Sequence, residues 1–262
     1  MNTRLSAIKY ALVTGASSGI GLQYCNALAK AGVNLVLVAR NQQRLQAAKQ
    51  DLIDKYAIKV LVIQQDLSIP DAAQAIFDIT ERENISIDML INNAGHADQE
   101  DFLAANHAEH IKMINAMLTA VVSFCYLYLP KMLEHKTGNI INVGSVAGIV
   151  GFSKDQKGKR SQRTMYRPLK SFVIGFTEQL EQSYRGSGIK FQCICPGLTV
   201  SDFHRRSGEV ELYSSLPKFM WMSSAAVVDQ SLRSLSKSKK VVLVTGWFNK
   251  LVVFVWKLLH LF

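Results

Sequence analysis

Short apolar runs alternate with helical patterns along most of the chain, and this alternation constrains the fold more than any other feature. A strand, a helix and a second strand form a βαβ unit. The helix crosses over the sheet so that the two strands run parallel, and this crossover is right-handed. We therefore predict an α/β fold, a single doubly wound domain over residues 1–262 with a parallel sheet covered by helices on both faces. The expected strands are 11–13, 35–38, 60–63, 89–91, 139–143, 189–194 and 241–246, and the expected helices are 20–31, 42–55, 71–82, 109–129 and 166–184.

Composition and charge narrow the class of protein. With 48% hydrophobic and 19% charged residues, the 262-residue chain can bury a large core. A net charge of +10 suits an anionic partner such as a phosphorylated cofactor, a membrane surface or nucleic acid. The sequence has no basic stripe interleaved with aromatic residues, so we do not expect a nucleic-acid partner.

The cysteines and the N-terminal region indicate a reducing compartment. Cys25, Cys125, Cys193 and Cys195 fit neither a disulfide framework nor a CxxC metal pair, so we expect reduced thiols. No apolar leader region precedes the first expected strand, so we predict no signal peptide. The expected location is cytoplasmic, with peripheral membrane contact as a further possibility through the apolar C-terminus.

Residues 14–21, with the sequence TGASSGIG, join the first expected strand to the first expected helix. Glycines allow a tight turn there and let backbone N–H groups approach a pyrophosphate, while the helix N-terminus adds partial positive charge. A glycine-rich turn alone is a weak signal, but its place at the start of a βαβ unit favours a Rossmann-type dinucleotide site. A turn that holds no ligand is the alternative interpretation.

Two further motifs accompany this turn: NNAG at residues 92–95 and the Pro-Gly pair at 196–197. Together with TGxxxGIG they resemble the short-chain dehydrogenase/reductase family, over roughly residues 7–250. The resemblance implies a nicotinamide cofactor and a homo-oligomer, with Asp66 at the adenine ring and the Pro-Gly turn beside the nicotinamide. The cofactor-binding residues that it implies are Gly15, Ser17, Ser18, Gly19, Ile20, Asp66, Asn92, Ala94, Gly95, Tyr166, Lys170, Pro196, Gly197 and Thr199.

The end of the second expected strand indicates which dinucleotide is bound. An acidic residue there would bond the ribose 2′-hydroxyl of NAD, whereas an arginine favours the 2′-phosphate of NADP. The strand is followed by Arg40 and Asn41, without a carboxylate. Arg40 can hold a phosphate with planar, charge-assisted hydrogen bonds. We predict NADP(H), with a merely solvated arginine as the alternative.

Tyr166 and Lys170 are four residues apart, so on a helix they share one face. A tyrosine with a pKa near 10 is a poor acid–base group at neutral pH until a nearby cation stabilises its phenolate. The spacing matches the family's YxxxK motif, and by resemblance Tyr166 is the acid/base while Lys170 lowers its pKa and holds the nicotinamide ribose. Ser145, just after an expected strand, resembles the family's substrate-orienting serine, whose hydroxyl holds the carbonyl oxygen. The implied activity is interconversion of a ketone and a secondary alcohol.

One departure from the family pattern concerns the proton relay. The family usually has an asparagine that helps to hold the lysine through water, and counting without gaps places Met117 there. A thioether does not replace the hydrogen bonding of an amide. Asn115 lies two residues earlier, about 200° around a helix, and does not substitute simply. A second class of function therefore stays open: an NADP(H)-binding scaffold or sensor with weak or no turnover. The retained Ser145, Tyr166 and Lys170 favour an enzyme.

A second departure is the interval of 21 positions (166 − 145) between Ser145 and Tyr166, which is longer than in the family. The excess coincides with a basic stretch at 153–163, SKDQKGKRSQR. This stretch is either a surface insertion without a role or a lid or docking loop for an anionic substrate or a membrane.

The C-terminal segment 247–262 is nearly all apolar, but it is too short to span a bilayer, which needs about 20 apolar residues. It packs against the core or a sister subunit, or it lies in a membrane interface with Trp247, Trp256 and nearby lysines at the headgroups. By resemblance the substrate is a small lipophilic carbonyl or alcohol. His107 and His110 are expected at the surface, and without a third ligand we predict no metal.

Overall fold

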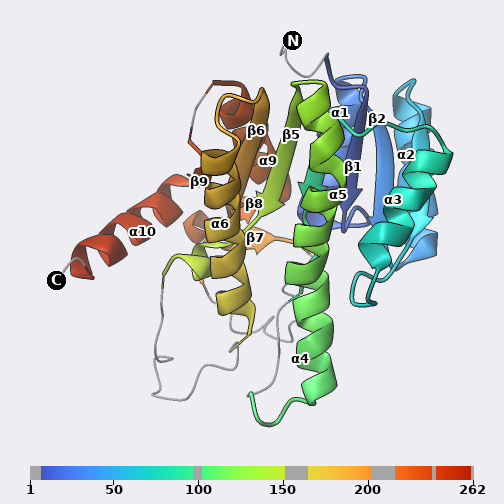
Figure 1. The fold of residues 1–262 in the computed structure, drawn as a ribbon. Helices are drawn as coiled ribbons and strands as arrows, with labels where there is room; N and C mark the ends of the chain where they lie inside the picture. The colour runs from blue at the N-terminus through green and yellow to red at the C-terminus, as the bar shows by residue number, and fades with distance from the viewer. Residues whose placement is uncertain (1–6, 97–101, 151–164, 202–215, 238–239, 261–262) are drawn as a thin grey trace.

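The computed structural model describes residues 7–96, 102–150, 165–201, 216–237 and 240–260. Its centre is a seven-stranded sheet in the order β3-β2-β1-β4-β5-β6-β9, in which every neighbouring pair is parallel (Figure 1). The predicted doubly wound α/β fold is confirmed. The strands are β1 (Tyr10–Thr14), β2 (Asn34–Ala39), β3 (Val60–Gln64), β4 (Met89–Asn92), β5 (Gly138–Val143), β6 (Ile189–Cys195) and β9 (Val242–Val244).

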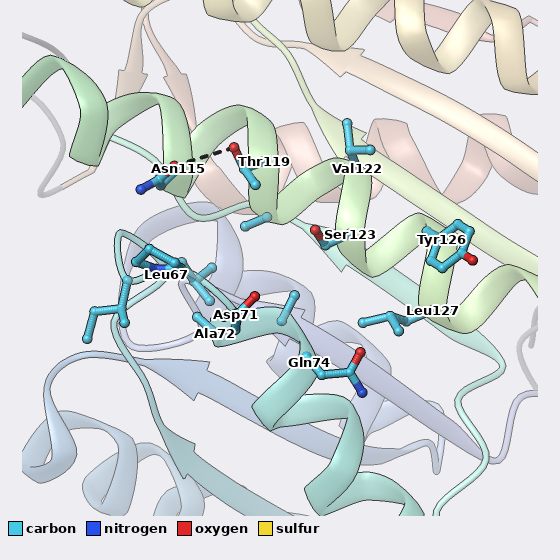
Figure 2. Close-up of a pocket in the computed structure, with 14 residues that line it drawn as sticks. Leu67, Asp71, Ala72, Gln74, Asn115, Thr119, Val122, Ser123, Tyr126 and Leu127 are labelled. Atoms are coloured by element: carbon cyan, nitrogen blue, oxygen red, sulfur yellow. Dashed lines mark hydrogen bonds between the residues drawn. The ribbon is translucent and has the colours of Figure 1, made fainter.

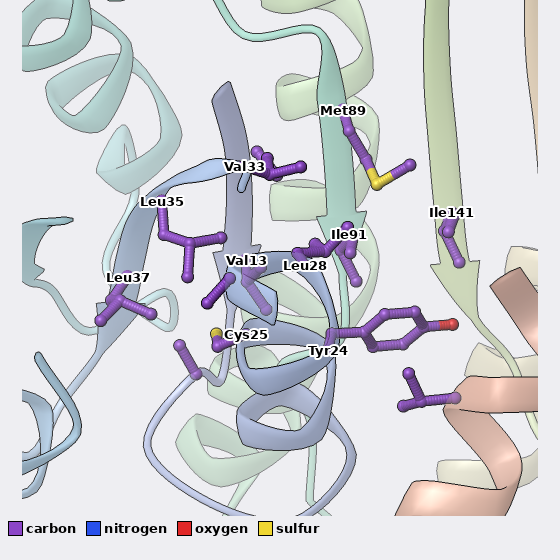
Figure 3. Packing of buried hydrophobic residues seen from close by; sticks show 14 of the residues in the cluster. Val13, Tyr24, Cys25, Leu28, Val33, Leu35, Leu37, Met89, Ile91 and Ile141 are labelled. Carbon is purple, nitrogen blue, oxygen red and sulfur yellow. The ribbon is translucent and has the colours of Figure 1, made fainter. Parts of the chain in front are cut away.

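Helices cover both faces of this sheet. One face carries α1, α2 and α9, and the other carries α3, α5 and α6 (Figure 1). On the first face the ring of Tyr24 extends from α1 toward Ile141, and its hydroxyl bonds Ser231 Oγ of α9 at 2.5 Å (Figure 3). The helices are α1 (Gly19–Lys30), α2 (Gln42–Lys55), α3 (Ala72–Arg82), α4 (His107–Ile114), α5 (Ala120–Glu134), α6 (Tyr166–Ser183), α9 (Ser224–Lys237) and α10 (Trp247–Leu259).

The strand order determines where a ligand can bind. The chain moves outward from β1 to β3, then returns to pair β4 on the other side of β1. In open α/β sheets, the crevice at the carboxyl ends of the strands beside such a reversal is the usual binding place. The turns after β1 and β4 meet at this point, and these are the turns that carry the glycine-rich and NNAG motifs.

The helix that contains Met117 is longer than predicted and is not uniform. It begins at His107, passes through the π-helical turn η2 (Asn115–Thr119), and continues through Pro130 to Glu134. By length and composition, residues 107–134 could also cross a membrane, but helices of a soluble core pass the same test. This helix buries Phe124, Tyr128 and other residues against the sheet, as a core helix does.

Two other features differ from the sequence-based expectation. Helix α9 was not predicted, because serines interrupt its apolar pattern, although Val228, Leu232 and Leu235 are buried at helical spacing. A short parallel pair, β7 (Thr199–Val200) and β8 (Met222–Ser223), follows the Pro-Gly turn. The basic stretch 153–163 lies outside the described residues.

Phe124 is expected to be a major contributor to stability, because its side chain is fully buried in the cluster that joins α5 to the sheet. Truncation to alanine should lower the free energy of unfolding by about 3–5 kcal/mol, through lost burial and the cavity left behind. Chemical denaturation followed by circular dichroism measures this change. Tyr126→Ala, on the same helix but 77% exposed, is the control and should change stability by less than about 0.5 kcal/mol.

Candidate functional site

The glycine-rich turn has the backbone geometry that a pyrophosphate site requires. Gly15 and Gly19 have φ values of +66° and +55°, in the left-handed region that favours glycine. A Cβ on Gly21 would lie 2.3 Å from the carbonyl oxygen of Gly15, so the turn closes tightly on the start of α1. The side chain of Ser18 caps none of the first-turn N–H groups of α1, which leaves these donors directed out of the helix end.

Hydrogen bonds tie this turn to the segment after β4. Thr14 Oγ1 accepts from the backbone N–H groups of Asn93 and Ala94 at 2.9 and 3.0 Å. In return, Asn93 Nδ2 donates to the carbonyl oxygen of Thr14 at 2.9 Å. The structure therefore brings two of the sequence motifs together. Asn93 was not among the predicted site residues, although its place within NNAG could have identified it.

Asn92, by contrast, points into the interior. Its Nδ2 donates to Asn142 Oδ1 at 2.8 Å, and Asn142 Nδ2 donates to Thr177 Oγ1 at 2.9 Å. These buried amides link β4, β5 and α6 behind the site. The side chain of Asn92 is thus engaged in the scaffold, and its assignment to the cofactor stays a prediction.

The Pro-Gly segment approaches the glycine-rich turn from the other side. Thr199 is buried and its Oγ1 donates to the carbonyl oxygen of Gly197 at 3.0 Å. Two residues later, Ser201 lies so close to Gly19 that a Cβ on this glycine would be 3.1 Å from Ser201 Cβ. The segment that follows β6 therefore lies against the glycine-rich turn that follows β1, so the structure brings these two motifs together.

Arg40 and Asp66 lie at the same sheet edge, after β2 and β3. Partial burial acts to raise the pKa of Asp66, but hydrogen bonding by Ser68 and the nearby positive charge of Arg40 outweigh it, and the pKa is lowered. Asp66 Oδ1 accepts the backbone N–H of Ser68 at 2.9 Å. Arg40 is exposed, so its guanidinium is open to a phosphate group.

Lys170 is buried beneath Tyr166. Both residues lie in the first turns of α6, and Lys170 Nζ is 5.7 Å from the centroid of the Tyr166 ring. Nζ donates to the carbonyl oxygen of Val143, at the end of β5, at 2.7 Å. Burial lowers the pKa of Lys170 to about 8, although the nearby Cys193 and Cys195 act in the opposite direction. The predicted pair is therefore assembled at the carboxyl edge of the sheet.

Ser145 is held between β5 and β6. The flanking Gly144 and Val146 donate their N–H groups to the carbonyl oxygens of Ile194 and Pro196, at 2.8 and 2.9 Å. Ser145 Oγ accepts the N–H of Ala147 at 3.1 Å, so its own proton can be given to another acceptor. The turn that follows, η3 (Val146–Gly148), is bonded to α6 through Ser171 Oγ and the Gly148 carbonyl at 2.7 Å.

Met117 lies in the π-helical turn, buried in one apolar cluster with Tyr166, Met113 and Leu169. Its side chain also lies against Gly95, where a Cβ would be 3.5 Å from Met117 Cε. Asn115 turns the other way and donates to the carbonyl oxygen of Ser68 at 3.1 Å. This hydrogen bond agrees with the expectation that Asn115 does not substitute for a relay asparagine, which stays a prediction.

A cavity of about 360 Å³ lies on the far side of this helix, between the start of α3 and the segment η2–α5 (Figure 2). Figure 2 shows Asn115, Thr119, Val122, Ser123 and Tyr126 on one wall and Leu67, Asp71, Ala72 and Gln74 opposite them. None of Ser145, Tyr166 and Lys170 lines it. The cavity is separate from the proposed reaction centre.

The prediction for His110 is wrong. The residue is 7% exposed, and its ring stacks on that of Phe102 with the centroids 4.8 Å apart. His110 Nε2 lies 2.9 Å from the Phe102 carbonyl oxygen. Imidazole is itself an aromatic ring and can stack on a phenylalanine that the fold brings beside it, which sequence spacing does not reveal. His107 is exposed, as predicted. Among the described residues no group of three or more His, Cys, Asp or Glu side chains could hold a metal.

Comparison with known sequences identifies a family and several relatives. A model of the short chain dehydrogenase family matches residues 9–211. Very-long-chain 3-oxoacyl-CoA reductase of Macaca fascicularis is 31% identical over 192 residues, covering 72% of this chain but only 58% of that protein. Dehydrogenase/reductase SDR family member 7 of Mus musculus is 30% identical over 252 residues, covering 94% of this chain and 72% of that protein.

Solved structures of related dehydrogenases have the same fold as this chain. A short-chain dehydrogenase from Sphingobium yanoikuyae in complex with NADPH superposes with a TM-score of 0.79 at 30% identity, covering 96% of this chain and 95% of that one. A bulky-bulky ketone specific alcohol dehydrogenase from Comamonas testosteroni has a TM-score of 0.75 at 28% identity, covering 96% and 94%.

The buried Lys170 should make stability depend on pH. Its pKa is about 8 in the folded chain against 10.5 without the fold, so between these values the unfolded chain binds more protons and stability rises with pH. Relative to Lys170→Met, the free energy of unfolding of the parent should rise by on the order of 3 kcal/mol between pH 8 and 10.5. Urea denaturation across this range measures the difference. Lys30→Met replaces an exposed lysine and is the control; its plot of unfolding free energy against pH should run parallel to that of the parent. A parallel plot for Lys170→Met would contradict the prediction.

Proposed function

The chain belongs to the short-chain dehydrogenase family, and we propose that it is an NADP(H)-dependent oxidoreductase that interconverts a ketone and a secondary alcohol on a lipophilic substrate. The observation that carries the proposal is the buried ammonium of Lys170, 5.7 Å from the Tyr166 ring centroid. An ammonium is costly to bury, and this one lies beneath a phenol at the edge of the sheet where the cofactor turn also lies.

The chain's own residues fit a dinucleotide. A Cβ on Gly15 or Gly21 would lie within 2.7 Å of Asn93 Nδ2, and Gly15 and Gly19 have positive φ values, so the turn at the N-terminus of α1 requires glycine. This turn would hold the pyrophosphate. Arg40 would contact the 2′-phosphate, and Asp66 the adenine end. When bound, the reduced nicotinamide supplies the hydride for the carbonyl carbon.

In the proposed reduction, Tyr166 donates its phenolic proton to the carbonyl oxygen as the carbon accepts hydride. The product is the alcohol, and Tyr166 is left as a phenolate. The positive charge of Lys170 stabilises this phenolate. The hydroxyl of Ser145 donates a hydrogen bond to the same oxygen and orients it toward Tyr166. Oxidation of the alcohol follows the same path in reverse.

A lipophilic substrate is supported by the residues near Tyr166 and by the relatives. Met113, Met117 and Leu169 pack with Tyr166, and Val146 and Ile149 follow Ser145. Two relatives are described as a very-long-chain 3-oxoacyl-CoA reductase and a bulky-bulky ketone specific alcohol dehydrogenase. Since the chain spans about three fifths of the length of the first, a long or bulky apolar ketone is proposed only as a class. The homo-oligomer stays a prediction.

NADP(H) is favoured over NAD(H) by Arg40 and by the absence of an acidic residue where β2 ends. The Sphingobium yanoikuyae relative, at 30% identity, is described in complex with NADPH. The exposed guanidinium of Arg40, beside Asp66, lies where the adenosine end of the dinucleotide would be bound.

One observation favours the second candidate function, an NADP(H)-binding scaffold or sensor with weak turnover. Met117 is 1% exposed and stands where the family's relay asparagine is expected. A thioether beside Tyr166 does not bind a water that could pass a proton to Lys170. This arrangement would slow proton resupply and leave dinucleotide binding intact.

Tyr166→Phe tests the proposed chemistry. It removes only the hydroxyl, so kcat with NADPH and a bulky apolar ketone should fall at least about 100-fold, while NADPH affinity stays within about twofold. Stopped-flow and steady-state NADPH consumption measure the two quantities. Tyr126→Phe, an exposed residue outside the site, is the matched control. Unchanged turnover in Tyr166→Phe would remove the role of Tyr166.

Met117→Asn separates the two candidate functions. If the site is an impaired enzyme, the introduced amide should raise kcat by several-fold without changing NADPH affinity, because it can hold a relay water. Single-turnover kinetics with a panel of ketones measures the change. NADPH binding without turnover, in the parent and in Met117→Asn alike, would favour the scaffold.

Arg40→Ala tests the cofactor preference. Loss of charge-assisted bonds to the 2′-phosphate should weaken NADPH binding by about tenfold to a hundredfold and leave NADH binding nearly unchanged. Dinucleotide fluorescence titrations measure both. Arg44→Ala, in the first turn of α2, is the control. If Arg40→Ala weakened the binding of NADPH and of NADH equally, this result would count against a contact between Arg40 and the 2′-phosphate.

A further inference from the structure

The C-terminal helix α10 presents an apolar face outward. At about 100° per residue, its exposed apolar side chains fall within a sector of about 140° of the helix surface. Lys250 and Lys257, both exposed, lie together beside this sector. The exposed apolar residues are Trp247, Leu251, Phe254, Val255, Leu258 and Leu259.

The opposite face of the helix fixes it to the body of the protein. Asn249 and Val253 are buried, and Val253 packs with Val146 and Val150 at the turn after Ser145. Asn249 lies against Gly197, where a Cβ would be 2.1 Å from Asn249 Oδ1. Core packing therefore does not use the outward face, and α10 extends away from the sheet at one side of the molecule (Figure 1).

Aromatic residues from a second segment enlarge this face. Phe219, in the short turn η4 (Lys218–Met220), is 57% exposed. Its ring centroid is 6.2 Å from that of Trp247 and 5.4 Å from that of Phe248. The start of α10 thus carries an aromatic cluster at the surface, with Lys218 beside it. Trp with nearby lysines is typical of groups that lie at lipid headgroups.

Charge identifies the kind of partner. Residues 230–262 contain no Asp or Glu, and their basic residues are Arg233, Lys237, Lys239, Lys240, Lys250 and Lys257. Two copies of this face would bring like charges together, whereas an anionic surface would complement them. With 13 residues, α10 is about 20 Å long, so it is suited to lying in an interface and too short to cross a bilayer.

We propose that the outward face of α10, together with Phe219, is a docking surface for membranes that contain anionic lipid. The apolar side chains enter the boundary between headgroups and acyl chains, and the lysines contact lipid phosphates. Because the inner face of α10 packs against the turn that carries Ser145, docking holds the substrate side of the molecule near the bilayer, where lipophilic ketones concentrate.

Vesicle co-sedimentation of the full chain tests this proposal without using activity. The parent should bind vesicles of phosphatidylcholine with phosphatidylglycerol, and added salt should weaken this binding. Leu251→Gln/Phe254→Gln should lower the partition coefficient at least about tenfold, since both side chains are exposed and their removal spares the core. Lys250→Gln/Lys257→Gln should lower it about fivefold per lysine on the anionic vesicles only.

The control is Ile53→Gln/Ile111→Gln, which removes exposed apolar residues elsewhere and should leave vesicle binding unchanged. Absence of binding to anionic vesicles at low salt would overturn the proposal. So would undiminished binding of Leu251→Gln/Phe254→Gln. If that variant instead converts an oligomeric parent to a monomer and the parent ignores vesicles, a sister subunit covers the face and the membrane proposal fails. Circular dichroism confirms that each variant is folded.

Discussion

Backbone hydrogen bonds between parallel strands hold this molecule in its functional arrangement. Parallel pairing requires a crossover after every strand, so all seven carboxyl ends emerge at one edge of the sheet. The turns after β1, β4, β5 and β6 consequently meet there, although they come from distant parts of the chain. Thr14 and Asn93 join the first two turns, and the bonds from Gly144 and Val146 join the last two. The site is a consequence of the strand order.

The buried ammonium of Lys170 is a costly element in this arrangement. Its compensation comes from the Val143 carbonyl oxygen and from the face of the Tyr166 ring. Cys193 and Cys195 pack nearby with their Sγ atoms 4.0 Å apart, and their mutual hydrogen bond and burial raise the pKa of Cys195. All four cysteines are buried free thiols, as the sequence indicates.

Much of the fold and part of the site follow from sequence patterns alone. Apolar runs mark every strand of the main sheet, and the TGxxxGIG, NNAG and YxxxK motifs mark the turns and helix that converge at its edge. What the patterns do not reveal depends on tertiary contacts. The π-helical turn around Met117 arises within a helix whose sequence has no break there, and the burial of His110 depends on a stacking partner eight residues away. Asn249 and helix α9 acquire their roles only when distant segments pack.

The contact between Asn249 and Gly197 gives the C-terminal helix α10 a structural role in addition to the proposed membrane contact. Its inner face packs against the Pro-Gly turn and the valines that follow Ser145, so α10 forms part of the wall behind the proposed reaction centre. A form of the protein shortened ahead of Trp247 would lose that wall along with any lipid contact, and its inactivity would say nothing about membranes. Only substitutions on the outward side of the helix can separate attachment from catalysis.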